Sequence, residues 1–139
     1  MQTKRWRGVV STFLDPLTYF HAIRLLHFYG YSHVRPRRRV TMGAGATLAP
    51  NVSIRNGERI SIGSGTKVGE HAFLWGGDNA GRITIGEHCR LGPEVFITAS
   101  DYGLHPDQPV AYQQRNERDV VIGNDVWLGA RVFVGAGVT

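Results

Sequence analysis

A six-residue period from about residue 40 to residue 139 narrows the choice of fold for this chain more than any other feature. An aliphatic residue or methionine leads each hexad, and a small residue stands four places on. The hexads read MGAGAT, LAPNVS, IGSGTK, VGEHAF, IGEHCR, LGPEVF, IGNDVW, LGARVF and VGAGVT. A period of two would indicate an ordinary strand and a period of 3.6 a helix, whereas six fits neither as one continuous element. A very short strand with a tight turn does fit, so the sequence predicts coils of three hexads stacked as parallel β-sheets.

The leading residues of the hexads are those expected inside such a coil. They are Met42, Leu48, Ile54, Ile62, Val68, Leu74, Ile85, Leu91, Ile97, Ile122, Leu128 and Val134. The small residues four places on would fill the remaining interior space. The single cysteine, Cys89, holds one of these positions, so we interpret it as a core residue rather than a nucleophile. A lone cysteine also excludes an intramolecular disulfide, which favours a reducing compartment.

The repeat resembles the hexapeptide-repeat acyltransferases over about residues 40 to 139. The stretch DVVIGNDVWLGARVFVGAGVT is similar to the maltose and galactoside O-acetyltransferase branch of that family, above all at Val126-Trp127-Leu128-Gly129-Ala130. This resemblance implies a left-handed coil, which the spacing does not show, because parallel crossovers are normally right-handed. The expected fold class is therefore all-β, a left-handed parallel β-helix of hexapeptide repeats with an N-terminal α-helical arm.

Three insertions interrupt the repeat, each after the third hexad of a coil, at 55–61, 75–84 and 98–121. If three hexads complete one turn, these loops leave the coil at one corner. Adjacent coils lie about 4.8 Å apart, so the loops must meet along one edge. Insertions also collect where they do least damage. The longest loop nevertheless shows no obvious secondary structure, which favours a functional role, and we place the candidate site at this edge.

The resemblance implies transfer of an acyl group, usually acetyl, from coenzyme A to a hydroxyl or amine by a homotrimer with active sites between subunits. A histidine, whose ordinary pKa is near 6.5, suits the role of general base at neutral pH. In the sugar acetyltransferases that histidine stands five places after a leading aliphatic residue and commonly precedes proline. Counting from Ile97 gives Tyr102, whereas the pair His105-Pro106 comes three residues later. His105 is therefore the predicted base, and the loop register is left open.

The other predicted site residues lie in the loops and in the last coils. Asp101 could orient an imidazole and Tyr102 could bind the acceptor, so both are assigned to catalysis. The predicted substrate-binding residues are Trp75, Asp78, Asn79 and Trp127. The resemblance places acetyl-CoA, the acyl donor, around Gly129, Ala130, Gly135 and Ala136. No metal is expected, and each of these side chains also fits a packing or solvated role.

The N-terminal arm, residues 1–39, carries most of the positive charge. Residues 1–40 hold eight Lys/Arg and one acid, which gives them a net charge of +7. The whole chain has a net charge of +5, so residues 41–139 carry −2. Asp15 as N-cap, Pro16 as first residue and Gly30 as C-cap predict a helix from about Pro16 to Tyr29. Fourteen or so residues are too few to cross a bilayer, which needs about 20. The helix would pack over the end of the core or lie on a membrane surface.

These features suggest partners and a location. The predicted acceptor is a sugar or a lipid-linked saccharide, as in polysaccharide assembly. A basic arm permits contact with a membrane surface, while the absence of any nucleic-acid motif argues against nucleic acid. We find no signal-peptide pattern, which favours the cytoplasm, with the inner face of the membrane as a second possibility.

Two other functions stay open. The repeat could form a noncatalytic scaffold or interaction module, in line with Tyr102 where a histidine is expected. It could also resemble the γ-class carbonic anhydrases, with zinc held by His71, His88 and His105, which are seventeen residues apart. However, His71 follows a second hexad and His88 a first, so both are predicted at turns of different corners. The repeat stops in mid-pattern at Thr139, so further C-terminal coils, or another chain over this end, are expected.

Overall fold

The computed structural model describes residues 11–139, and the chain divides after Tyr31 into two compact units. Residues 32–39, which the sequence grouped with the N-terminal arm, belong to the unit that contains the repeat. The basic residues Lys4, Arg5 and Arg7 lie outside the described residues. Each unit is considered by itself below.

Helix α2 of the first unit spans Pro16–Tyr29, as the sequence predicted. Asp15 caps it, because its Oδ1 accepts a hydrogen bond of 2.9 Å from the backbone N–H of Leu17. Gly30 is its C-cap, also as predicted. Gly30 keeps a right-handed conformation, with φ −57°, and the chain continues into a π-helical turn, Gly30–Val34. Because it includes helix α2, the fold is not strictly all-β, in contrast to the expected fold class. Within residues 11–139, no helix is long and apolar enough to cross a membrane.

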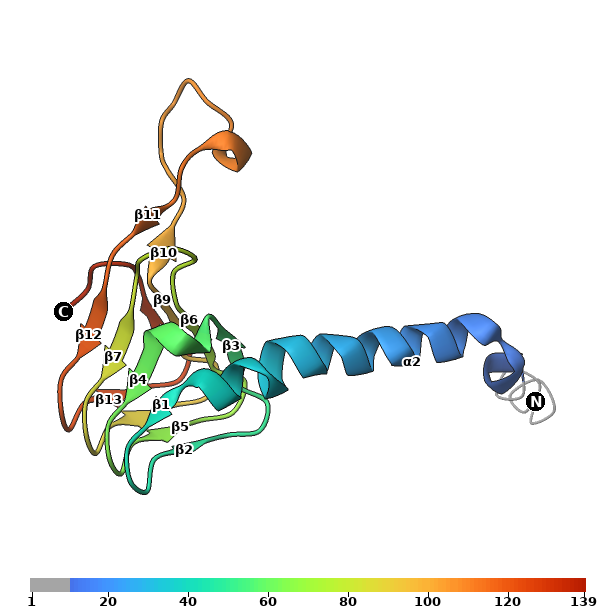
Figure 1. Cartoon of the computed structure of the whole chain (residues 1–139), viewed down its shortest axis with the longest axis horizontal. Helices are drawn as coiled ribbons and strands as arrows, with labels where there is room; N and C mark the ends of the chain where they lie inside the picture. Colours follow the sequence, from blue (N-terminus) through green and yellow to red (C-terminus); the bar gives the residue numbers. More distant parts are fainter. Residues whose placement is uncertain (1–10) are drawn as a thin grey trace. The chain divides into compact units, whose positions relative to one another are not determined.

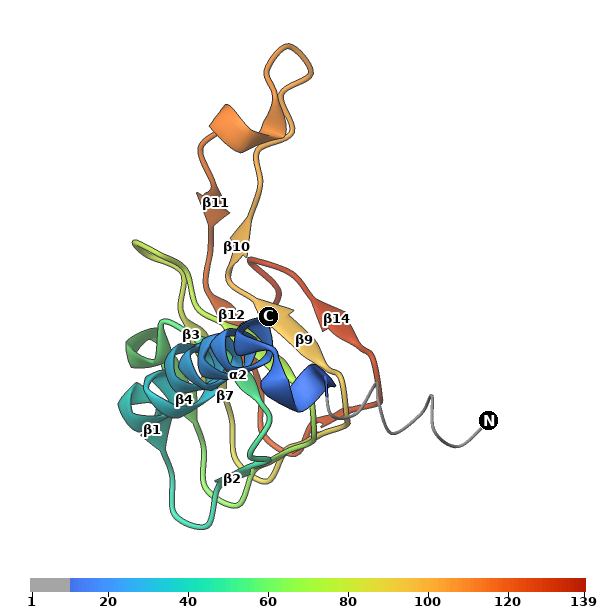
Figure 2. The ribbon, with the colours of Figure 1, turned by 90° about the vertical axis from the view of Figure 1, so that its right-hand side faces the viewer.

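The second unit is a coil of three parallel four-stranded sheets (Figures 1 and 2). The first sheet holds β1 (Thr41–Met42), β4 (Ile60–Ile62), β7 (Ile83–Ile85) and β12 (Val120–Ile122). The second holds β2 (Thr47–Leu48), β5 (Lys67–Val68), β8 (Arg90–Leu91) and β13 (Trp127–Leu128). The third holds β3 (Ser53–Arg55), β6 (Phe73–Trp75), β9 (Phe96–Thr98) and β14 (Phe133–Val134). Every coil adds one strand to each sheet, which fits a left-handed β-helix of hexapeptide repeats.

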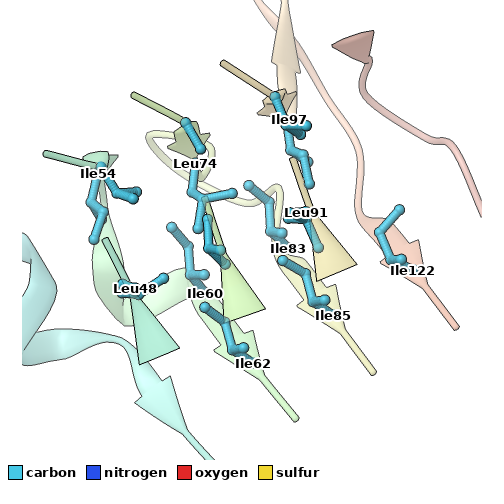
Figure 3. Close-up of a cluster of buried hydrophobic side chains, with 14 of the residues drawn as sticks. Leu48, Ile54, Ile60, Ile62, Leu74, Ile83, Ile85, Leu91, Ile97 and Ile122 are labelled. Atoms are coloured by element: carbon cyan, nitrogen blue, oxygen red, sulfur yellow. The ribbon is translucent and has the colours of Figure 1, made fainter. Parts of the chain in front are cut away.

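The leading residues of the hexads form the interior of the coil, where side chains from all three sheets converge (Figure 3). Leu74 and Ile97 are fully buried. Cys89 is also fully buried, and its thiol donates to the carbonyl oxygen of Gly123 at 3.1 Å, which confirms it as a core residue. Met42 is an exception, with 38% of its surface exposed, because the first coil has a neighbouring coil on one side only.

Part of the basic cluster near residue 37 closes the first coil. A 3-10 helix, η2 (Pro36–Arg39), places Arg37 so that its guanidinium donates to the carbonyl oxygens of Ala49, at 3.0 Å, and Leu48. Arg39 forms an ion pair of 3.6 Å with Glu58. These two arginines therefore have structural partners, and their charge is not simply available to an external anion.

All three insertions connect the third sheet to the first, so they leave at one corner as predicted. Their bounds are narrower than expected, at 56–59, 76–82 and 99–119. The reason is that Ile60, Ile83 and Val120 already point inward two residues before the leading residue and so begin the next strand. The first connection contains the 3-10 helix η3 (Gly57–Arg59).

The longest insertion, residues 99–119, is an arm rather than the unstructured loop that the sequence suggested. Its strands β10 (Ser100–Asp101) and β11 (Asn116–Glu117) pair in antiparallel fashion, and its outer part contains a 3-10 helix, η4 (Val110–Tyr112). In both views the arm extends away from the coil (Figures 1 and 2).

Candidate active site

The corner connections are held together by hydrogen bonds from one coil to the next. Asn56 donates through Nδ2 to the carbonyl oxygens of Gly76, at 3.1 Å, and Gly77, at 2.9 Å. Arg59 donates through Nη1 to the carbonyl oxygen of Ala80, at 2.9 Å. The carbonyl groups of Gly76, Gly77 and Ala80 thus bind the connection below, which leaves the N–H groups of residues 78–81 for the arm above.

Glu117 of the arm takes up those N–H groups, in an arrangement that we call the Glu117 clamp. Its Oε1 accepts from Asp78 at 2.7 Å, and its Oε2 accepts from Asn79 at 3.0 Å, Ala80 at 2.5 Å and Gly81 at 3.3 Å. A carboxylate bound by several backbone N–H groups is a strong, charge-assisted contact. The clamp therefore fixes the base of the arm against the coil.

The clamp changes the acidity of its carboxyl group. The N–H of Ala80 lowers the pKa of Glu117 most, and the N–H groups of Asn79, Asp78 and Gly81 add to this, while partial loss of hydration raises it. The net result is a pKa below the ordinary 4.5. A carboxyl group with a depressed folded-state pKa stabilises the fold fully above its unfolded value, and this contribution is lost as the pH falls through the folded value.

We expect the clamp to open only in acid. Amide exchange at residues 78–81, corrected for intrinsic rates, should show constant protection from about pH 7 to about pH 5 and decreasing protection below about pH 4.5. A Glu117→Gln variant, which keeps one acceptor oxygen but no ionisable group, should show weaker protection with no such acid step. The same acid step in both proteins would assign it to another group.

The corner pocket lies on the outer face of the third sheet, where the arm leaves the coil. It encloses about 280 Å³. Its lining consists of aromatic, charged and hydroxyl-bearing residues and one glycine from strands β3, β6, β9 and β14, from segment 76–82 and from the arm: Arg55, Trp75, Gly76, Asp78, Phe96, Thr98, Ser100, Asp101, Tyr102, Arg115 and Phe133. A concave site with a largely apolar lining and a few convergent polar groups is typical of small-molecule binding sites.

One wall of the corner pocket is a stack of aromatic rings. The ring centroids of Trp75 and Phe96 lie 4.7 Å apart, and those of Phe96 and Phe133 lie 5.4 Å apart. Trp75 also donates through Nε1 to Ser53 Oγ, at 3.4 Å. These rings point outward because each occupies a strand position next to an inward leading residue. An aromatic wall of this kind can pack against the apolar face of a sugar ring.

The opposite wall comes from the arm and is polar. Arg115 Nη1 forms an ion pair with Asp78 Oδ2, at 3.0 Å. The Cζ of the same guanidinium lies 5.1 Å from the ring centroid of Tyr102, and Nη2 donates to the Tyr102 hydroxyl at 3.5 Å. The arm is therefore tied to the coil by Arg115 as well as by Glu117.

The structure brings together four of the predicted site residues, since Trp75, Asp78, Asp101 and Tyr102 all line the corner pocket. Asn79 contributes its backbone N–H to the Glu117 clamp but does not line the pocket. Trp127, predicted to wall the pocket, lies instead on β13 of the second sheet with 80% of its surface exposed. It belongs to a strand rather than to the turn where it was expected, and that strand is in the second sheet, whereas the pocket lies on the third.

His105 lies in the outer part of the arm, outside the corner pocket of its own chain. Its N–H donates to Gln113 Oε1 and its carbonyl oxygen accepts from Gln113 Nε2, both at 2.9 Å. Gly103 makes this packing possible, because a Cβ there would lie 2.6 Å from Gln113 Oε1. The backbone around His105 is thus fixed while the residue itself is exposed.

The residues predicted to hold acetyl-CoA fall in two places. Gly129 lies in the last coil and occupies the turn equivalent to Gly92, where a Cβ would meet the backbone of Gly129 and Ala130 in the following coil. Gly135 adjoins the corner pocket, because a Cβ there would lie 3.9 Å from Asp101 Oδ2. Ala130 is exposed next to Gly129, whereas Ala136 is buried.

Sequence reasoning missed several lining residues and the clamp. Phe96 and Phe133 each precede a leading residue by one, so the period of two within a strand would have placed them on the outer face. Arg55 directly follows the leading residue Ile54 at the end of its strand, so the same alternation would have placed it on the outer face. For Ser100, Arg115 and Glu117 no local signal exists, because their positions depend on how the arm folds.

The three histidines of the zinc hypothesis are far from forming one cluster. His71 and His88 have positive φ angles, 54° and 58°, and occupy turns at different corners, as predicted. His105 lies in the arm. Among residues 11–139, no group of three or more His, Cys, Asp or Glu side chains is placed to hold a metal ion.

Known proteins similar to this chain include acetyltransferases. The chain is 32% identical over 100 residues to Nodulation protein L of Rhizobium meliloti (strain 1021). The aligned region covers 70% of this chain and 51% of that protein. It is 33% identical over 100 residues to the candidate colanic acid biosynthesis acetyltransferase WcaF of Escherichia coli (strain K12), covering 68% and 52%. Galactoside O-acetyltransferase of the same strain is 25% identical over 127 residues, covering 83% and 59%.

A solved structure shows the same fold. The hexapeptide-repeat containing acetyltransferase of Vibrio cholerae matches with a TM-score of 0.52 and 24% identity, over 73% of this chain and 56% of that one. The Vibrio cholerae protein has also been solved in complex with acetyl coenzyme A. No protein-family model matches the chain. The chain spans about half the length of the curated relatives it matches. These matches confirm the resemblance to hexapeptide-repeat acetyltransferases.

Proposed function

We propose that this chain, whose relatives include sugar-related acetyltransferases, forms the acceptor site of an acyl-CoA-dependent O-acetyltransferase acting on a sugar or polysaccharide precursor. The observation that carries the proposal is the corner pocket, a concave site with an aromatic wall and convergent polar groups. It lies at the one corner where all insertions gather, on a fold shared with an acetyltransferase that binds acetyl-CoA. The coil is taken as left-handed, as in that family.

In this proposal the donor supplies an acetyl thioester, and the chain's own groups handle the proton and the acceptor. The imidazole of His105 takes the proton from the acceptor hydroxyl as that oxygen attacks the acetyl carbon. It then returns the proton to the departing thiolate of coenzyme A. General bases of this kind contribute roughly 10²–10⁴-fold to a rate. Asp101 and Tyr102, both in the pocket lining, would orient the imidazole and the acceptor.

The position of His105 in the outer arm is compatible with a homotrimer. The arm extends away from its own coil (Figures 1 and 2). His105, in the outer part of the arm, is not in the lining of the corner pocket of its own chain. In a closed three-fold assembly each arm would reach the pocket of the adjacent subunit. In the proposal the pantetheine group of the donor would bind at Gly129 and Ala130, and its thioester end would lie by Gly135 and Ala136, since Gly135 adjoins the corner pocket.

Two further parts of the proposal concern location. A cytoplasmic enzyme would meet acetyl-CoA directly. Helix α2 by itself buries none of its side chains. An apolar helix within the basic N-terminal segment, residues 1–39, would suit the surface of an anionic membrane that carries a lipid-linked acceptor.

The proposal is tested by release of free coenzyme A thiol from acetyl-CoA, with the longest natural form of the chain and a panel of sugars and oligosaccharides. We expect thiol release that depends on the acceptor, with a matching gain of one acetyl group in the acceptor mass. A reaction without acceptor measures hydrolysis alone. If thiol release and acetyl-CoA binding are both absent, the repeat serves as a noncatalytic scaffold instead.

A further inference from the structure

Arg55 has an unusual place in the corner pocket. Its Cζ lies 3.6 Å from the centroid of the Trp75 ring, so the guanidinium is stacked on the indole. The two residues are paired in register on β3 and β6. Stacking holds the plane of the guanidinium but leaves the N–H groups at its edge available. Within residues 11–139, no acceptor takes a hydrogen bond from the Arg55 side chain.

The other arginine of the pocket is different. Arg115 is paired with Asp78 across the gap between the arm and the coil. Arg59, which follows Arg55 at the same corner, donates to the carbonyl oxygen of Ala80. Arg55 is thus a cation that the fold holds in place at the pocket without neutralising its charge. A planar guanidinium held in this way matches a carboxylate or phosphate with two parallel hydrogen bonds.

Away from Arg55, the pocket lining presents a hydroxyl group and a carboxylate instead of a cation. Ser100 Oγ is buried and is the one buried side-chain polar atom in the described residues without a hydrogen-bond partner. A buried hydroxyl without a partner is costly, so it points to a group that a ligand supplies. Asp101 lies next to it in the lining. Arg55 and Thr98, the residue two before Ser100, are two strands apart in register, so their Cα atoms are separated by roughly 10 Å.

We propose that the corner pocket binds an acidic saccharide, with its carboxylate or phosphate on Arg55 and its hydroxyl groups on Ser100 and Asp101. The sugar ring would pack on the aromatic wall against Phe96, whose strand β9 lies between β6 and β14. This inference rests on the proposed function for the identity of the acceptor, although binding of the acidic sugar does not require turnover. Carboxylate and phosphate share the chemistry that Arg55 recognises, and the test separates them.

The test is binding in the absence of acetyl-CoA, monitored by the fluorescence of Trp75 in a background in which Trp6→Phe and Trp127→Phe remove the other two tryptophans. Glucose, glucuronic acid and glucose 1-phosphate serve as neutral, carboxylate and phosphate probes. We expect at least one anionic probe to bind roughly 10- to 100-fold more tightly than glucose, as for hydrogen bonds between charged groups. The preference should fall as the ionic strength rises.

Variants at Arg55 test whether the preference for anionic sugars depends on the guanidinium of this residue. Arg55→Gln should abolish it while leaving the affinity for glucose within about twofold, and Arg55→Lys should keep part of it because the charge remains but the planar fork is lost. Arg82→Gln removes the same charge from the neighbouring segment 76–82 without touching the pocket, so it should keep the full preference. Thermal unfolding of each variant shows that the fold is intact.

The outcomes separate this inference from the proposed function. A preference for glucuronic acid indicates a uronic acid acceptor, and a preference for glucose 1-phosphate indicates a phosphorylated one. Binding that depends on Arg55 without any acetyl transfer would retain the acidic-saccharide site and remove the proposed function. Equal affinity for all three probes, no detectable binding of any, or a preference unchanged in Arg55→Gln overturns the inference.

Discussion

Replacing His105 with alanine is expected to lower acetyl transfer by roughly 10²–10⁴-fold, because the acceptor hydroxyl then loses the group that takes its proton. The affinity for the acceptor should change little, since His105 is not part of the pocket lining in its own chain. The measurement is kcat and KM for the acceptor, with the effect expected almost entirely in kcat. A variant that loses affinity instead would indicate a binding role for this residue.

Tyr102→Phe is the matched comparison, because Tyr102 occupies the position where the sugar acetyltransferases have their histidine. Removing its hydroxyl leaves the ring that packs near Arg115 but deletes the hydrogen bond of 3.5 Å between them. We expect a reduction smaller than that of His105→Ala. An unchanged rate in His105→Ala, with a large loss in Tyr102→Phe, would move the catalytic role to Tyr102.

His105 in the arm and Trp75 in the pocket together test the subunit arrangement. If the arm of one subunit serves the pocket of the next, His105→Ala and Trp75→Ala subunits should complement each other when mixed and reassembled. Random assembly would restore about a quarter of the sites in a closed ring. If each subunit used its own His105, no mixed assembly would recover activity.

The sequence predicted the coil well because its interior repeats with a fixed period. Residues such as Leu74 and Ile97 must point inward in every turn, and any other register would expose them. The common corner of the insertions followed from counting hexads, and with it the approximate place of the site. Helix α2 was likewise predictable, since Asp15 and Pro16 act on their immediate neighbours.

The interior of the site could not be predicted in the same way, because it depends on contacts between segments far apart in the chain. Glu117 binds N–H groups 36 to 39 residues earlier, and nothing around it in the sequence indicates this. Trp127 shows the opposite problem. It stands next to a leading residue and matches the family pattern, yet it lies on the second sheet, away from the arm. The sheet to which a residue belongs follows from the place of its hexad as first, second or third in the coil, and Trp127 precedes the second hexad of its coil.

Gly81→Ala is expected to destabilise the protein by about 3 kcal/mol, the upper part of the range for overpacking a tight site. A Cβ at Gly81 would lie 2.2 Å from the carbonyl oxygen of Ala99, which is a backbone atom and cannot rotate away. Segment 76–82 must therefore shift from the base of the arm. That shift also weakens the Glu117 clamp, since Gly81 donates to Glu117 Oε2 at 3.3 Å. Urea unfolding gives the free energy of unfolding, and acceptor binding should weaken along with it.

Gly123→Ala is the matched control within the same repeat. Gly123 lies in the last coil of the 139 residues, where a Cβ would meet no atom within 4 Å, so in this chain the substitution adds the same methyl group without a clash. Because alanine also restricts the unfolded chain, the free energy of unfolding should stay the same or rise by up to about 1 kcal/mol. Equal losses in both variants would show that glycine is required by the coil in general. A loss confined to Gly81, together with faster amide exchange at residues 78–81, would instead show that the contact between segment 76–82 and Ala99 sets the position of the arm over the corner pocket.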